Sequence, residues 1–173
     1  MRVSFVLPVS ADRLYHAWLD PKEHGAFTGG GAVTSTPKVG GKWSAFDGYA
    51  QGKYLELVAP GKIVMSWHAQ DFPEGAPDSQ VEVLFQPASG GTRVTILHAD
   101  LPPGSEERFR KGWRRFYEAK MREHFHVDTA AAGTPAPAAV ATRRRTGKGA
   151  PKVAASKAKG PSHRSPTSKP RSG

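Results

Sequence analysis

The segment from Ser105 to about Phe125 is the longest in the sequence with helical periodicity, and one side of it is apolar. Glu106 and Glu107 fall in its first turn, where the helix dipole favours negative charge. The residues that recur on the apolar side are mostly aromatic: Phe109, Trp113, Phe116, Tyr117 and Met121. A helix with such a stripe is stable only when another element covers it, so it must pack against a sheet or other helices.

The sequence between Ala32 and Asp100 provides a sheet, because it alternates short apolar strands with turn residues. Asp47-Gly48 lies between two arms that carry aromatic residues, which predicts a two-residue hairpin. Pro60-Gly61 predicts a type II turn, and Ala88 to Gly91 joins two alternating runs. Connections this short pair consecutive strands in an antiparallel sheet.

One strand and two short helices are predicted before this region. The strand has Val3, Phe5 and Leu7 on one face, and Ser10 and Asp20 are suitable N-caps for the two helices. The predicted fold class is therefore α+β: a curved antiparallel sheet of about six to seven strands wrapped around a long C-terminal helix, with two short helices after the first strand.

Charge divides the chain into two parts. Residues 1–128 contain 15 Lys and Arg, all 15 Asp and Glu, and every Trp, Tyr and Phe. Residues 129–173 contain 10 Lys and Arg, no acid and no aromatic residue, so the net charge of +10 arises there. Such a composition cannot bury enough apolar surface to offset the entropy of ordering. We expect one folded domain at 1–128 and a disordered basic tail, rich in Ala, Lys, Pro, Ser and Arg, at 129–173.

The tail predicts non-specific association with nucleic acid, because its cations can neutralise phosphates without reading sequence. The candidate cations are Arg143, Arg144, Arg145, Lys148, Lys152, Lys157 and Lys159. A solubilising role gives the same composition, and no aromatic residue is interleaved for base stacking. No apolar run approaches the ~20 residues of a membrane-spanning helix. We therefore expect no membrane span and a cytoplasmic location.

The chain resembles the SRPBCC, or START-like, helix-grip superfamily, and within it the domain of activators of heat-shock protein 90 ATPase (AHSA-type). The resemblance covers nearly all of residues 1–128 and excludes the tail. It rests on the order and spacing of "ADRLYHAWLDPKEHGAFTGG", "GGKWSAFDGYAQGKYLEL", "KIVMSWHAQDFPEGAPDSQVEVLF", "GGTRVTILHADLP" and the "GW" of the last helix.

The resemblance implies a sheet wrapped around the C-terminal helix with an apolar cavity between them. Because this fold serves several functions, two functions are expected in addition to nucleic-acid association by the tail. The leading one is binding of a small hydrophobic or aromatic ligand. The alternative is a stand-alone chaperone-regulator-like interaction protein. This alternative is weaker, because the eukaryotic activators carry a separate N-terminal domain that engages the chaperone, whereas this chain begins at its first strand.

The candidate cavity residues are Trp18, Phe27, Trp43, Trp67, Phe85, His98, Trp113 and Tyr117. Large aromatics fill ordinary cores as readily as they line cavities, so filling is the alternative for each of them. Alternation places His98 on the same face as Val94 and Ile96, where it is either a satisfied core histidine or a polar group that orients a ligand. Gly112 interrupts the long helix, which indicates either a close approach of the sheet or room for a ligand.

No catalytic motif is recognisable in the sequence, and no enzymatic activity is assigned. No zinc-protease, Rossmann or phosphate-loop spacing occurs, and the histidines form no metal-binding pattern. Asp71, Glu74 and Asp78 lie in a loop rich in Pro and Gly, which predicts a solvated acidic turn. A cyclase or hydrolase that uses His98 or Tyr49 as an acid or base is compatible with the sequence but has no spacing to support it. We therefore expect no catalytic residue, no metal and no cofactor.

Overall fold

The computed structural model describes residues 1–131, with side chains described to residue 125. Residues 129–131 of the predicted tail continue the C-terminal helix, and the rest of the tail lies outside this range. Seven strands form one sheet: β1 Arg2–Leu7, β2 Thr34–Ser35, β3 Lys42–Ala45, β4 Ala50–Val58, β5 Lys62–Ala69, β6 Ser79–Ala88 and β7 Gly91–Ala99. The helices are α1 Ala11–Leu19, α2 Pro21–Thr28 and a continuous C-terminal helix of three segments: α3 Glu106–Gly112, η1 Trp113–Glu118 and α4 Ala119–Ala131. These are the predicted elements in the predicted order.

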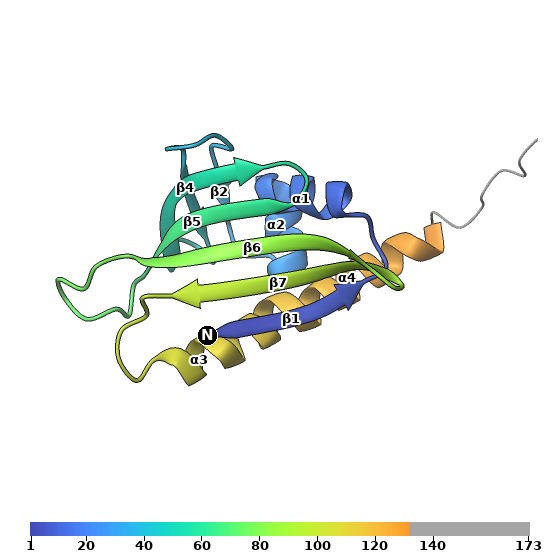
Figure 1. Ribbon diagram of the computed structural model, residues 1–173. Helices are drawn as coiled ribbons and strands as arrows, with labels where there is room; N and C mark the ends of the chain where they lie inside the picture. The colour runs from blue at the N-terminus through green and yellow to red at the C-terminus, as the bar shows by residue number, and fades with distance from the viewer. Residues whose placement is uncertain (132–173) are drawn as a thin grey trace, which may run out of the picture. The chain divides into compact units, whose positions relative to one another are not determined.

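The sheet is antiparallel throughout, with strand order β1-β7-β6-β5-β4-β3-β2. Strands β2 to β7 pair with their neighbours in sequence, as their short connections predict, whereas β1 pairs with β7 and completes the sheet. Figure 1 shows the long C-terminal helix running along one face of the sheet, with α1 and α2 on the same side. The core lies between this face and the helices, and it includes Val3, Phe5 and Leu7 of β1.

Local signals begin and end the two short helices. The Ser10 hydroxyl accepts a hydrogen bond from the Arg13 backbone N–H, and the Asp20 carboxylate accepts bonds from the first turn of α2. Gly29 ends α2 in the left-handed conformation, with φ 108°. The side chains of Trp18 and Phe27 are fully buried, so the two helices fill the end of the sheet next to α4.

The C-terminal helix widens at its centre, where η1 is a π-helix. An α-helix has 3.6 residues per turn, so a side chain repeated every four residues drifts about 40° at each step. The wider π turn rotates each residue less and offsets this drift. As a result the four-residue repeat Phe109, Trp113, Tyr117, Met121 and Phe125 stays buried over its whole length. The prediction that Phe116 belongs to the buried stripe is wrong, because it falls outside this repeat and is 41% exposed.

Two turns differ from their predicted types. The hairpin at Asp47-Gly48 has a four-residue loop, Phe46–Tyr49, because Ala45 pairs with Ala50. The turn at Pro60-Gly61 contains a cis Ala59–Pro60 bond, and the Gly61 N–H donates to the carbonyl of Val58. Both hairpins still join antiparallel neighbours, so the topology is the predicted one. Among the helices described to residue 131, none is long and apolar enough to cross a membrane.

Candidate functional site

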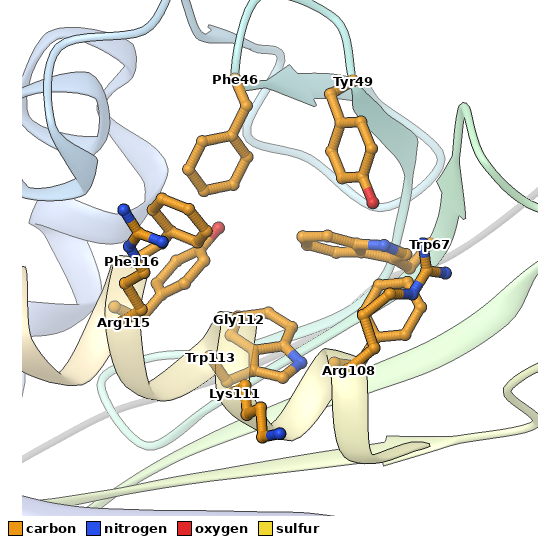
Figure 2. A pocket seen from close by; sticks show the side chains of 11 residues that line it. Phe46, Tyr49, Trp67, Arg108, Lys111, Gly112, Trp113, Arg115 and Phe116 are labelled. Atoms are coloured by element: carbon orange, nitrogen blue, oxygen red, sulfur yellow. The ribbon is translucent and has the colours of Figure 1, made fainter. Parts of the chain in front are cut away.

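A pocket of about 550 Å³ lies between the Phe46–Tyr49 loop, strand β5 and the segment α3–η1. Figure 2 shows the loop on one side of the space, Trp67 on a second side and the helix opposite the loop. Seven aromatic side chains line it: Phe46, Tyr49, Trp67, Phe109, Trp113, Phe116 and Tyr117. The remaining lining residues are Gly112 and three cations, Arg108, Lys111 and Arg115. Apolar walls with a few polar groups at the margin are typical of small-molecule sites, and the volume is in their usual range.

Gly112 opens the helix side of this pocket. A Cβ atom built on Gly112 would have no heavy atom of its surroundings within 4 Å. The backbone there has ordinary helical angles, φ −59° and ψ −51°, which every residue adopts. Neither a close approach of the sheet nor an unusual conformation therefore requires glycine. Of the two explanations for this residue, only room beside the helix agrees with the geometry.

The Phe46–Tyr49 loop carries two of the lining aromatics and has an unusual backbone. Phe46 and Asp47 both have positive φ, 55° and 56°, a region that costs a residue with a side chain roughly 1–2 kcal/mol. The Asp47 carboxylate accepts a hydrogen bond from the Ala32 N–H, and the Gln70 N–H donates to the carbonyl of Tyr49. The surrounding structure thus holds the loop in a conformation that local preferences disfavour, as is common at binding sites.

Contacts on two sides of the pocket connect this loop to the rest of the protein. The Tyr49 hydroxyl donates to Asp71 at 2.9 Å, and the other Asp71 oxygen pairs with Arg108 of α3. The Phe46 and Phe116 rings meet edge to face, with centroids 5.8 Å apart. Asp71 lies exposed in a turn, as predicted, and its carboxylate in addition links the loop to the helix.

His98 holds the Trp113 ring through a fully paired chain of hydrogen bonds. The Ser79 hydroxyl donates to the carbonyl of Trp67 at 2.9 Å, so the His98 Nε2–H donates to Ser79 Oγ at 2.8 Å. The indole N–H of Trp113 then donates to His98 Nδ1 at 3.1 Å, which requires a neutral imidazole. Burial, and secondarily the positive N-terminus, lower the pKa of His98 to about 3. His98 is thus the satisfied core histidine of the two sequence alternatives, and it positions a pocket wall.

His24 supports Tyr117 in the same way. Its Nδ1 lies 2.8 Å from the carbonyl of Trp18 and must donate to it, so Nε2 is left to accept from the Tyr117 hydroxyl at 3.2 Å. Burial lowers the pKa of His24 to about 4 and raises the pKa of Tyr117. Two neutral histidines therefore fix two pocket aromatics from behind.

The eight predicted cavity residues separate into three groups. Trp67, Trp113 and Tyr117 line the pocket, whereas Trp18, Phe27 and Phe85 pack against one another in the core. Trp43 and His98 lie behind the pocket wall, in contact with Trp67 and Trp113 respectively. Ring-to-ring contacts connect the groups in one row, Trp43, Trp67, Trp113, Tyr117 and Trp18, with centroids 4.4–5.1 Å apart.

The indole N–H groups of Trp43 and Trp67 are buried, and neither has a hydrogen-bond partner among the described residues. A buried unpaired donor costs about 1–3 kcal/mol, and a core selected for stability alone avoids it. The Trp67 ring lines the pocket, and the Trp43 ring packs against Trp67 behind it. The two unpaired donors therefore lower the stability of the core at this end of the sheet.

Several lining residues were not predicted from the sequence as ligand contacts: Phe46, Tyr49, Arg108, Phe109, Lys111, Arg115 and Phe116. Four of the helical ones, Arg108, Phe109, Arg115 and Phe116, follow from Gly112, since residues three and four positions away share its face. Lys111 is adjacent to Gly112 and does not follow from this spacing. The loop residues carry no such signal, because their inward position depends on the positive φ angles of Phe46 and Asp47. The seven tail cations lie outside the described residues.

Comparison with known proteins identifies the family. A family model described as activator of Hsp90 ATPase homolog 1-like protein matches residues 8–126. The human activator of 90 kDa heat shock protein ATPase homolog 1 is 30% identical over 116 residues, which are 67% of this chain and 34% of the human protein. The mouse homolog 2 is 37% identical over 76 residues, 44% of this chain and 23% of the mouse protein. The chain therefore matches about a third or less of the length of these relatives.

Solved structures agree with this assignment. An HSP90 activator from Plasmodium falciparum has a TM-score of 0.64 and 26% identity, and the match covers 78% of this chain and 96% of that protein. A protein from the dynemicin biosynthetic locus has a TM-score of 0.63 at 15% identity, covering 74% of this chain and 47% of that protein, and it shows only the shared fold. The predicted helix-grip fold is confirmed. The chain belongs to the activator of Hsp90 ATPase homolog 1-like family.

Proposed function

We propose that this family member binds a small apolar molecule in the pocket beside Gly112. The observation that carries the proposal is the empty space at this glycine, since no packing contact or backbone angle requires it. An Ala at an exposed or open helical position is more favourable than Gly by about 1 kcal/mol. The chain forgoes this stabilisation on the face that borders a pocket of about 550 Å³.

The walls support an apolar and at least partly planar ligand. Trp67 and Trp113 are in contact with each other and present large rings to the same space, while Phe46 and Tyr49 lie across from the helix (Figure 2). Removing apolar surface from water stabilises a complex by about 25 cal/mol per Å². Flat rings gain further from stacking on aromatic side chains. The strained loop and the unpaired indole N–H groups place stability costs at the same site.

Filling the pocket from Gly112 tests the proposal. Gly112→Leu is expected to weaken binding of the neutral fluorophore N-phenyl-1-naphthylamine at least about tenfold, because the added side chain occupies ligand space; tenfold corresponds to about 1.4 kcal/mol. The free energy of unfolding should rise or stay unchanged, because Leu has the higher helix propensity. Fluorescence titration and urea unfolding measure the two quantities.

Ala119→Leu is the matched control, because it enlarges the side chain at an exposed position of the same helix outside the pocket. It should leave fluorophore binding unchanged. If Gly112→Leu binds the fluorophore as tightly as the original protein, the pocket is not the binding site and the proposal is wrong.

A second proposed function is regulation of an Hsp90-type chaperone, and the names of the relatives support it. The chain matches part of the human activator and nearly the whole length of the Plasmodium falciparum HSP90 activator structure. A pocket ligand and a chaperone partner are compatible, because a partner can bind the outer surface while a ligand occupies the pocket.

The chaperone proposal predicts that adding the full chain to the Hsp90-type chaperone of its own cell raises the chaperone's ATPase rate several-fold. Gly112→Leu should raise the rate equally, because it alters the inside of the pocket and leaves the surface unchanged. An ATPase rate that stays at its basal value at saturating protein, together with no capture of the chaperone above background, would exclude this function.

Nucleic-acid association through Arg143–Arg145 and the tail lysines, and a cytoplasmic location, are proposals from composition. The ten cations of residues 129–173 support the first, and they lie outside the described residues.

A further inference from the structure

The residues that line the pocket carry positive charge and no negative charge. Arg108, Lys111 and Arg115 line the pocket, and no Asp or Glu is among its lining residues. Residues 1–128 as a whole carry equal numbers of acidic and basic side chains, so the imbalance is local to this site. A cavity of low polarity with cations on one margin raises the local concentration of anions.

Two of the three cations already have acidic neighbours. Arg108 pairs with Asp71, and Lys111 lies 4.0 Å from Glu107. Figure 2 also shows the Lys111 side chain directed away from the centre of the pocket. Arg108 therefore serves to hold the loop, and Lys111 contributes at most a distant charge.

Arg115 is different, because within the described residues its guanidinium pairs with no carboxylate. It stacks over the Phe116 ring, with its central carbon 5.3 Å from the ring centroid, and Figure 2 shows it on the side of the pocket opposite Arg108. Three acidic residues of the same helix pair with other cations: Glu107 with Arg110, Glu118 with Arg122, and Glu123 with Lys120. A planar guanidinium with free donors is suited to bidentate binding of a carboxylate, sulfonate or phosphate.

We infer that the pocket selects an amphipathic anion: a flat apolar body that lies between Trp67, Trp113 and the Phe46–Tyr49 loop, and a negatively charged oxyanion group that Arg115 binds at the mouth. This inference rests on the proposed function and narrows its ligand class. The apolar body accounts for the ring-lined interior, and the anion accounts for an arginine that no acidic side chain of the described part neutralises.

Two fluorophores with the same ring system test the charge requirement. 8-Anilinonaphthalene-1-sulfonate is N-phenyl-1-naphthylamine with an added sulfonate, so the pair differs only in the anionic group. The sulfonate should bind at least about fivefold more tightly than the neutral compound, which is about 1 kcal/mol and within reach of an ion pair with an exposed arginine. Arg115→Gln should abolish this preference, so that the ratio of the two dissociation constants falls to about one.

Arg114→Gln is the matched control, because Arg114 is the adjacent exposed arginine, lies outside the pocket lining and likewise pairs with no carboxylate among the described residues. It removes the same charge and should keep the preference intact. Suppose that Gly112→Leu blocks binding of both fluorophores. If the sulfonate then binds no more tightly than the neutral compound, or if Arg115→Gln does not change their ratio, the anion inference is wrong and the apolar pocket is still supported. If Gly112→Leu blocks neither compound, the proposed function itself fails.

Discussion

Lowering the pH from 7 to 5 is expected to reduce the free energy of unfolding by about 3–4 kcal/mol, because two buried histidines stay neutral in the folded protein. Burial lowers the pKa of His98 to about 3 and that of His24 to about 4, from an ordinary value of 6.5. Each hydrogen-bond network also requires a neutral ring, since His98 accepts from Trp113 and His24 accepts from Tyr117.

The direction follows from proton binding. Between pH 7 and pH 5 the unfolded chain takes up a proton at both histidines, whereas the folded protein takes up almost none. The unfolded state therefore gains stability as the pH falls, at up to about 1.4 kcal/mol per pH unit for each group. The contribution of the two neutral histidines is complete above pH 6.5. It is lost progressively as the pH falls towards their folded pKa values.

Urea unfolding at pH 7, 6 and 5 measures this loss. Replacing His24 with Gln removes one titrating group and should roughly halve the pH dependence. A free energy of unfolding that is constant between pH 7 and pH 5 would contradict the neutral-histidine assignment.

The architecture was predictable because its signals are local. Val3, Phe5 and Leu7 alternate, Ser10 and Asp20 cap helices, and short turns force antiparallel pairing. These features depend on neighbouring residues in the sequence, so the sequence alone is sufficient to recognise them. The inward position of His98 followed from the same alternation.

The site was predictable only in part, because its shape depends on contacts distant in sequence. Tyr49 reaches the pocket from a loop whose backbone has positive φ at Phe46 and Asp47. Asp71 is 37 residues from Arg108 and joins it only once the sheet and helix have packed. The π segment of the long helix is likewise set by packing, and it moves Phe116 out of the buried stripe. No local pattern encodes these features. The local signals of the pocket were Gly112 and the predicted cavity aromatics Trp67, Trp113 and Tyr117.

Trp113→Ala is expected to lower the free energy of unfolding by about 3–5 kcal/mol, the usual cost of truncating a large buried aromatic. Trp113 is 3% exposed, contacts the rings of Trp67 and Tyr117, and donates to His98. The substitution removes the centre of the aromatic row, so it should also weaken binding of N-phenyl-1-naphthylamine. Urea unfolding and fluorescence titration measure the two effects, and a loss of less than about 1 kcal/mol would show that the ring is not part of the core.

Trp113→Phe separates packing from hydrogen bonding and keeps the prediction testable if the alanine variant does not fold. Phenylalanine retains an aromatic ring but leaves His98 Nδ1 without a donor, which should cost about 1–3 kcal/mol at pH 7. In the original protein, protonation of His98 Nδ1 would bring its new hydrogen against the indole N–H of Trp113. The phenylalanine variant has no indole N–H, so the folded pKa of His98 should rise. The difference in unfolding free energy between the two proteins should therefore shrink as the pH falls below 5 towards the folded pKa of His98, about 3. A difference that is equal at pH 7 and pH 4 would mean that Trp113 only packs against His98 and has no influence on its protonation.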